Sequence, residues 1–265
     1  MSTAPSANMP SPPPSQNGRP KYDQFMIFGD SITQFSYDQR LGFGFGAALE
    51  SDYARRLDVV NRGFSGYTTA NARVLFPQIW PTLQEGRVRL MTIFFGANDA
   101  VLPPHAQQVP LDQYKENLKF LIQHPSVKEH GTKIIILTPP PINEYQLQYF
   151  DAEKGFDTPS RTAANTKLYA DACRDVAQSL GVPVADIWMA IMKSTGWETG
   201  QPLTGSKEVP ANQQLASMLT DGLHFTGNGY KVMYEEVMKT IRATWPEEAP
   251  EKLPEVFPPW NIAPK

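Results

Sequence analysis

Residues 25–31 read FMIFGDS, a short apolar run that ends in glycine, aspartate and serine. Four consecutive apolar residues are typical of a strand that is buried on both faces, and Gly-Asp-Ser is typical of the turn that ends it. A serine at this point lies at the end of a strand, and its amide can begin a helix. Ser31 is therefore a candidate nucleophile, although an ordinary turn serine has the same pattern.

The rest of the chain alternates strands and helices in the same way. Further short apolar segments indicate strands at 57–61, 90–95, 133–137 and 182–187. Helical patterns occur at 45–56, 68–79, 111–123, 161–180 and 228–245. This alternation predicts an α/β protein with a doubly wound, five-stranded parallel sheet and helices on both faces. In such sheets binding sites form at the carboxyl ends of the strands, so the loops there should carry the function.

The composition excludes several classes of protein. The chain has 265 residues, of which 41% are hydrophobic and 19% charged, as in ordinary globular domains. Its formal net charge of −3 argues against a nucleic-acid binder, which would need a basic surface. Cys173 is the single cysteine and cannot form an intramolecular disulfide, and the four histidines are too scattered for a structural zinc site. No apolar run approaches the ~20 residues of a membrane span.

The uneven distribution of proline suggests that the chain has three parts. The 25 prolines exceed the usual share, and much of the excess lies at the two ends. Residues 1–20 are predicted to be a disordered leader because they are rich in proline and serine, and they lack the apolar core of a secretion signal. Residues 21–245 form the expected domain, and residues 246–265 an extended tail. These features together favour a cytoplasmic protein.

Two more predicted loops contain candidate hydrogen-bond donors. Residues 61–67 read NRGFSGY, which narrowly misses the G-x-S-x-G nucleophile pattern. Ser65 is thus a weak nucleophile candidate, and Gly66 is better interpreted as a backbone donor that approaches a ligand. Asn98 follows the most apolar strand, where its side-chain amide could meet a developing oxyanion. Simple turn chemistry is the alternative for both loops.

The last predicted loop, residues 220–226, reads TDGLHFT. Asp221 and His224 are three residues apart, so the carboxylate can hold one ring nitrogen of the histidine. The other nitrogen would then be free to act as a base. A single D-x-x-H sequence is also compatible with an ordinary loop histidine.

Taken together, these short motifs have a recognisable order: Gly29-Asp30-Ser31, Gly66, Gly96-x-Asn98-Asp99 and Asp221-x-x-His224. Over roughly residues 22–243 they resemble the conserved blocks of the SGNH hydrolases, the GDSL esterase/lipase family. The wider sequences FGDSITQ at 28–34, NRGFSGY at 61–67, TPPP at 138–141 and DGLHF at 221–225 resemble most the isoamyl acetate-hydrolysing esterases. Ile32 replaces the leucine of GDSL, a conservative change.

The resemblance implies a flavodoxin-like sheet, no cofactor and no catalytic metal. It makes Ser31 the nucleophile, His224 the general base and then acid, and Asp221 the residue that orients His224. The oxyanion hole would consist of the Ser31 amide, the Gly66 amide and the Asn98 side chain. The implied substrate is a small ester with a short acyl group such as acetate.

Other functions remain open from the sequence alone. Acyl-sugar deacetylation and lysophospholipid or thioester hydrolysis would use the same motifs, and an inactive binding module could keep the fold. Residues 42–47 read GFGFGA and match a dinucleotide-binding pattern, but they begin more than ten residues after the first predicted strand rather than directly behind it. Aromatic and aliphatic residues of the predicted loops could line a substrate pocket, namely Phe35, Phe43, Phe45, Leu102, Tyr145 and Tyr149.

The proline-rich tail differs from the leader because it contains large apolar residues. Val256, Phe257, Trp260 and Ile262 have no reason to lie in a solvated tail, so we expect it to be packed on a folded surface. The simpler expectation is that it covers helices of its own chain. The alternative is that it reaches a second copy near the substrate mouth, which would make a homodimer.

Overall fold

A computed structural model describes residues 21–263, so the expected leader at 1–20 lies outside the described residues. Five parallel strands form one sheet in the order β2-β1-β3-β4-β5. Their bounds are β1 Asp23–Gly29, β2 Leu57–Gly63, β3 Val88–Phe94, β4 Lys133–Leu137 and β5 Val184–Ala185. The doubly wound α/β fold that the sequence predicts is confirmed.

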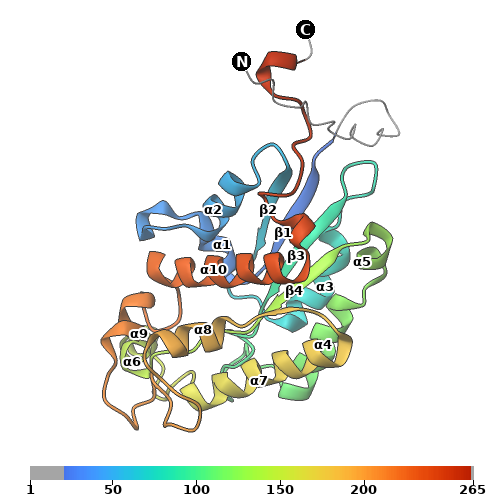
Figure 1. The fold of residues 1–265 in the computed structure, drawn as a ribbon. Coiled ribbons are helices and arrows are strands. Elements are labelled where there is room, and N and C mark those ends of the chain that lie inside the picture. The colour runs from blue at the N-terminus through green and yellow to red at the C-terminus, as the bar shows by residue number, and fades with distance from the viewer. Residues whose placement is uncertain (1–20, 264–265) are drawn as a thin grey trace, which may run out of the picture.

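Helices cover both faces of the sheet (Figure 1). One face packs against α2 (Phe45–Asp52), α8 (Ile187–Ser194), α9 (Gln213–Met218) and α10 (Gly227–Thr244). The other packs against α3 (Thr69–Ile79), α4 (Leu111–Ile122) and α7 (Ala163–Leu180). The shorter helices are α1 (Ser31–Gln34), α5 (Pro125–His130) and α6 (Glu144–Glu153). None of the described helices is long and apolar enough to cross a membrane.

Alternate residues of β1 explain the two cores. Phe25 and Ile27 point into the cluster under α2 and α10, whereas Met26 and Phe28 point into the cluster under α3 and α4. All four side chains are fully buried, as expected for a central parallel strand with helices on both sides. The register pairs Gly29 with Gly63 and with Phe94, so β1, β2 and β3 end at one level. The three loops that follow therefore meet at one edge.

Two predicted elements differ from the structure. The strand expected at 182–187 has only two residues, because Asp186 caps α8 by accepting a hydrogen bond from the Met189 amide. The helix expected at 45–56 ends at Asp52, and Arg55 then adopts a positive φ of 65° in the turn that leads to β2. Both errors arose where a tight connection begins earlier than the apolar pattern indicates.

The tail lies at the amino end of the sheet, away from α6 and α9 (Figure 1). Glu248, in the short 3₁₀ helix η3 (Pro246–Glu248), is 3% exposed and pairs with Arg89 at 2.7 Å and Lys133 at 2.6 Å. Its carbonyl accepts a hydrogen bond from the Tyr53 hydroxyl at 2.9 Å. Farther along, the Val256 amide donates to the Arg55 carbonyl at 2.9 Å.

The expected apolar anchors of the tail divide into two groups. Val256 and Phe257 are half-buried, and the Phe257 ring lies 6.0 Å from that of Tyr22. Trp260 and Ile262, in the 3₁₀ helix η4 (Trp260–Ile262), are 89% and 67% exposed. The expectation that these last two residues pack on the same chain is wrong, because the tail leaves the protein surface before it reaches them.

Candidate active site

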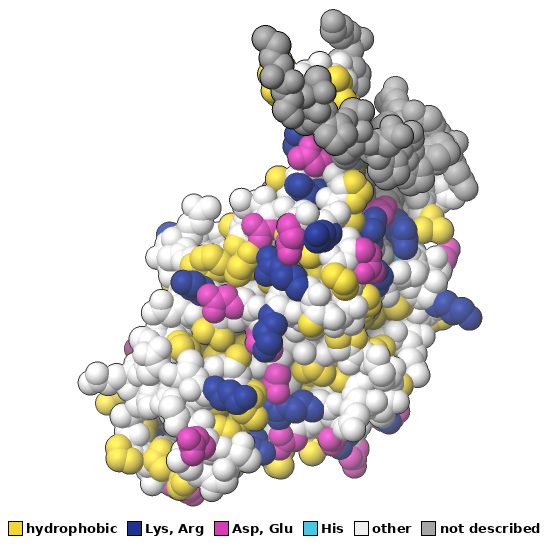
Figure 2. Space-filling view, viewed as in Figure 1, with side chains coloured by type: hydrophobic (Ala, Val, Ile, Leu, Met, Phe, Trp, Pro, Cys, Tyr) yellow, Lys and Arg dark blue, Asp and Glu magenta, His cyan; other side chains and the backbone are white. Residues whose placement is uncertain are grey.

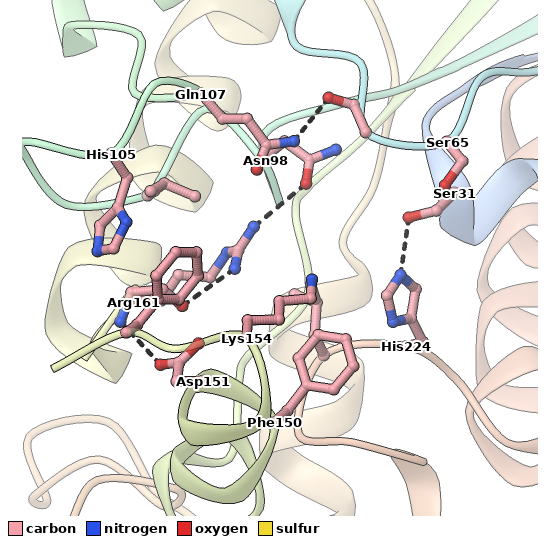
Figure 3. Close-up of a pocket in the computed structure, with 15 residues that line it drawn as sticks. Ser31, Ser65, Asn98, His105, Gln107, Phe150, Asp151, Lys154, Arg161 and His224 are labelled. Atoms are coloured by element: carbon pink, nitrogen blue, oxygen red, sulfur yellow. Dashed lines mark hydrogen bonds between the residues drawn. The ribbon is translucent and has the colours of Figure 1, made fainter. Parts of the chain in front are cut away.

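Ser31 is the first residue of α1, and only Asp30 separates it from the end of β1. Asp30 caps this helix, since its carboxylate accepts a hydrogen bond from the Ile32 amide at 2.9 Å. The turn needs glycine at position 29, because a Cβ there would lie 2.1 Å from the Thr33 hydroxyl oxygen. The side chain of Ser31 is thereby held at the carboxyl edge of the sheet, where its Oγ lies 2.8 Å from His224 Nε2 (Figure 3).

His224 is held by Asp221 in the turn before α10. The distance between His224 Nδ1 and Asp221 Oδ2 is 2.7 Å, and Asp221 Oδ1 accepts from the amides of Leu223 and His224. Burial acts to raise the pKa of Asp221, but the hydrogen bonds and charge of His224 outweigh it and hold the pKa at about 2. A carboxylate only accepts, so Nδ1 carries the ring proton. Nε2 is then an acceptor for the Ser31 hydroxyl.

Gly66 lies in the loop after β2 with a φ of +80°, a conformation that favours glycine. The Gly66 carbonyl accepts a hydrogen bond from Gln107 Nε2 at 2.7 Å, and the neighbouring Ser65 amide donates to Gln34 Oε1 at 2.8 Å. These contacts fix the loop beside Ser31. Ser65 also lines the cavity, but the hydroxyl that is hydrogen-bonded to His224 is that of Ser31.

Asn98 joins the loop after β3 to the Gly66 loop. Its side-chain Nδ2 donates to the Tyr67 carbonyl at 2.9 Å. The next residue, Asp99, accepts hydrogen bonds from the amide, at 2.9 Å, and the hydroxyl of Thr69 at the start of α3. The two loops are therefore tied together at both residues. Neither the Ser31 nor the Gly66 amide donates a hydrogen bond to another described residue.

A cavity of about 130 Å³ lies between these loops and α6. Its apolar lining is formed by Val101, Phe150, Phe156 and Leu223. Its polar lining includes, besides Ser31, Ser65, Asn98 and His224, the side chains of His105, Gln107, Asp151, Lys154, Ser160 and Arg161. Among residues 21–263 no group of three His, Cys, Asp or Glu side chains is placed to hold a metal ion.

The expected pocket residues Phe35 and Phe43 do not line this cavity. Phe35 lies outside it, with its ring 6.2 Å from the His224 ring. Phe43 packs against Tyr234 of α10, at a ring distance of 5.5 Å. Phe45, which was also considered, is fully buried in the core beneath α2.

The other expected pocket residues, Leu102 and Tyr145, are also outside the cavity. The Tyr145 hydroxyl donates to the Val209 carbonyl at 2.7 Å, so its ring points away from Ser31. For Tyr145 the cause is α6, a helix that the sequence analysis did not predict. This helix turns Phe150 toward the cavity and leaves Tyr149 70% exposed.

Sequence reasoning also missed Arg161, which precedes the N-cap residue of α7. Its side chain is 7% exposed and lines the cavity. Nε donates to the Ala97 carbonyl at 2.7 Å, and Nη2 donates to Asn98 Oδ1 at 3.2 Å. No local pattern distinguishes this arginine from an ordinary surface residue at a helix start, because Ala97 and Asn98, which it binds, are more than 60 positions away.

Comparison with known proteins identifies the family. Residues 27–232 match the model of the GDSL-like lipase/acylhydrolase family. The isoamyl acetate-hydrolyzing esterase of Saccharomyces cerevisiae is 32% identical over 91% of this chain and 94% of its own length. The human isoamyl acetate-hydrolyzing esterase 1 homolog is 33% identical over 91% of this chain and 88% of its own.

Solved structures show the same fold. The lipase/acylhydrolase of Enterococcus faecalis is 22% identical and has a TM-score of 0.57, over 83% of this chain and 96% of its own. Axe2, an acetylxylan esterase of Geobacillus stearothermophilus, is 19% identical with a TM-score of 0.59, over 83% and 94%. The family match covers most of the described residues and includes Ser31 and His224. The chain therefore belongs to the GDSL-like lipase/acylhydrolase family and is a carboxylic ester hydrolase.

Proposed function

We propose that the chain hydrolyses esters of short-chain acids, such as acetates, with Ser31 as nucleophile and His224 and Asp221 as its partners. The observation that carries the proposal is the continuous series of hydrogen bonds from Ser31 Oγ through the His224 ring to Asp221, with distances of 2.8 Å and 2.7 Å. This arrangement lets a neutral imidazole take the hydroxyl proton as the oxygen attacks.

In the first step Ser31 Oγ forms a bond to the acyl carbon, and His224 Nε2 takes its proton. The carboxylate of Asp221 stabilises the imidazolium that results. When the tetrahedral intermediate collapses, the alcohol leaves with the proton from His224. A water then attacks the acyl-enzyme with His224 again as base, which releases the acid and restores Ser31.

The negative charge of the tetrahedral intermediate needs donors that are already in position. Ser31, Gly66 and Asn98 come from three loops and line the same cavity, which supports a joint role for the Ser31 and Gly66 amides and the Asn98 side chain. Donors aimed at the oxyanion accelerate the reaction because the charge on that oxygen develops only on the way to the intermediate. We assign these three groups to the oxyanion hole.

The size of the cavity favours a short acyl group. Its volume of about 130 Å³ is close to that of engineered cavities of about 150 Å³ that hold benzene, a ligand of about six heavy atoms. An acetyl or butyryl group is of that size, whereas a fatty acyl chain is not. The yeast relative named above is an isoamyl acetate-hydrolyzing esterase, which agrees with this choice.

Acyl-sugar deacetylation is the second candidate. Polar residues of the cavity lining, among them Gln107, Asp151 and Lys154, could contact the hydroxyl groups of a sugar alcohol. Such an enzyme would still require a short acyl group, so the acyl preference holds for either alcohol. Lysophospholipid and long-chain thioester hydrolysis fit the cavity less well.

Rates of hydrolysis for a series of p-nitrophenyl esters, from acetate to palmitate, test the proposal. We expect kcat/KM to be highest from acetate to butyrate and to fall steeply for longer chains. A maximum at long chains would contradict the short-acyl assignment. Acetylated xylose and isoamyl acetate, compared at equal concentration, then distinguish a sugar from an apolar alcohol.

A further inference from the structure

Arg161 occupies an unusual position for a charged side chain. Its guanidinium reaches the side-chain oxygen of Asn98 (Figure 3), and the side-chain nitrogen of Asn98 faces the Tyr67 carbonyl. Its hydrogen-bond acceptors are the Ala97 carbonyl, the Ser160 hydroxyl and the Asn98 side-chain oxygen, all of which are uncharged. A buried cation is costly, and the nearby carboxylates of Asp151, Asp30 and Asp221 offset only part of that cost, since burial still lowers the pKa of Arg161.

The contacts of Asn98 determine which way its amide faces. The oxygen and the nitrogen of a carboxamide have nearly the same shape, so an isolated Asn98 could turn either toward the cavity. Arginine only donates, so the atom that faces Arg161 must be the oxygen. The Tyr67 carbonyl only accepts, so the atom that faces it must be the nitrogen. One N–H of Asn98 is thereby used, and the second is available to a ligand.

The charge of Arg161 adds to this orientation. A guanidinium bound to the amide oxygen draws electrons toward that oxygen, which makes the amide N–H a stronger donor. The effect is large in a buried site because little water screens it. Burial lowers the pKa of Arg161, but only to about 10, so the side chain keeps its charge at neutral pH.

We propose that Arg161 is a positioning residue for ester hydrolysis, which holds the Asn98 carboxamide with its NH₂ group toward the substrate oxyanion and strengthens that donor by its charge. This inference rests on the proposed function, because it assigns Arg161 an effect on the oxyanion through Asn98. The simpler alternative is that Arg161 only ties the start of α7 to the loop after β3 through Ala97 and Ser160.

A double-mutant cycle separates the two explanations. Arg161→Met keeps the length of the side chain and removes the donors and the charge, and Asn98→Ala removes the proposed donor. We expect Arg161→Met alone to lower kcat by about 10- to 100-fold, with little change in KM for p-nitrophenyl acetate. In the Asn98→Ala protein the same substitution should lower kcat by less than about threefold, since the group it acts through is gone.

Two further variants keep the test decisive. Arg161→Lys retains the charge and should lower kcat less than Arg161→Met does. It can replace Arg161→Met in the double-mutant cycle if the methionine variant is unstable. Arg174→Met, within α7, is the control, because Arg174 pairs with Asp186 at 2.8 Å and does not line the cavity. It should lower stability and leave kcat within about twofold.

Two results would overturn the proposal. If Arg161→Met lowers kcat by the same factor with and without Asn98, Arg161 does not act through that residue. If kcat is unchanged while the protein is merely less stable, Arg161 is structural. A wild type without Ser31-dependent hydrolysis would instead overturn the proposed function, and this inference with it. Parallel assays of Ser31→Ala therefore show which of the two has failed.

Discussion

The two ends of the parallel sheet differ in whether their buried charged side chains form ion pairs. At the amino end, Glu248 pairs with Arg89 and Lys133. At the carboxyl end, Asp30, Asp99 and Arg161 are about as well buried, yet none of them belongs to an ion pair among the described residues. On the face that Figure 2 shows, the side chains of Lys and Arg are mixed with those of Asp and Glu, so that charges of opposite sign are neighbours.

The consequence appears in the protonation of the unpaired groups. Burial raises the pKa of Asp30 to about 7 and that of Asp99 to about 6, and it lowers the pKa of Arg161 to about 10. Each shift means that the folded protein disfavours the charged form of the group. At the amino end the buried charge is paired and should stabilise the folded protein. At the carboxyl end the buried groups near the reacting residues have no ion-pair partner and should lower its stability. Substitutions at the two ends should therefore separate activity from stability.

The largest effect is expected at the carboxyl end, for Ser31→Ala. Removal of the nucleophile leaves only the oxyanion hole and binding, so kcat for p-nitrophenyl acetate should fall by on the order of 10⁴-fold or more. The midpoint of urea unfolding should hardly change. Ser65→Ala is the control in the same cavity wall and should retain most of the activity. A Ser31→Ala protein with near-wild-type hydrolysis would be incompatible with the proposed mechanism.

Asn98→Ala should give the next largest effect. The carboxamide is assigned to a charge that exists only during reaction, so kcat should fall by about 10²- to 10³-fold, or roughly 3–4 kcal/mol, with a small change in KM. Steady-state kinetics over a range of ester concentrations separate the two constants. If KM rises and kcat stays constant, Asn98 contacts the bound substrate rather than the oxyanion.

At the amino end, Glu248→Ala should lower stability and leave kcat unchanged. Loss of one partner from a buried ion pair costs about 3–5 kcal/mol. Arg89 and Lys133 remain 30% and 28% exposed, so water can solvate them, and we expect a smaller loss of about 2 kcal/mol in the free energy of unfolding. Urea denaturation measures it. Glu247→Ala is the matched control, because Glu247 pairs with the same Lys133 but is 60% exposed.

The smallest effect should come from Trp260→Ala at the end of the tail. A side chain that is 89% exposed contributes little to its own fold, so the free energy of unfolding should change by less than about 0.5 kcal/mol. Truncation of a buried side chain typically costs about 2 kcal/mol. A loss of that size or more would show that Trp260 packs on a surface in solution. Analytical ultracentrifugation of both proteins would then show whether that surface belongs to a second copy.

The sequence was most informative where the pattern is local. Buried strands have continuous apolar runs, and the turn motifs at Ser31, Asn98 and Asp221–His224 lie directly after predicted elements or in the predicted loop before α10. The shared edge of a parallel sheet was enough to expect them near one another. The structure brings these residues together, and the resemblance to a known family supplied the roles that we propose for them.

The substrate cavity could not be predicted, because it depends on distant contacts. Helix α6 lacks a strong amphipathic pattern, so nothing in the sequence indicated that Phe150 turns inward and Tyr145 outward. Arg161 reaches its partners across more than 60 positions of the chain. Such placements follow from the packing of whole elements, which neither composition nor spacing specifies.

The identity of the nucleophile is tested most directly by reaction with an organophosphate that labels activated serines, followed by mass spectrometry of the intact and digested protein. We predict one adduct per chain, located on Ser31, and loss of ester hydrolysis in proportion to labelling. The Ser31→Ala protein should remain unlabelled. An unlabelled wild type, or an adduct on Ser65 or elsewhere, would contradict the assignment of Ser31 as the nucleophile activated by His224.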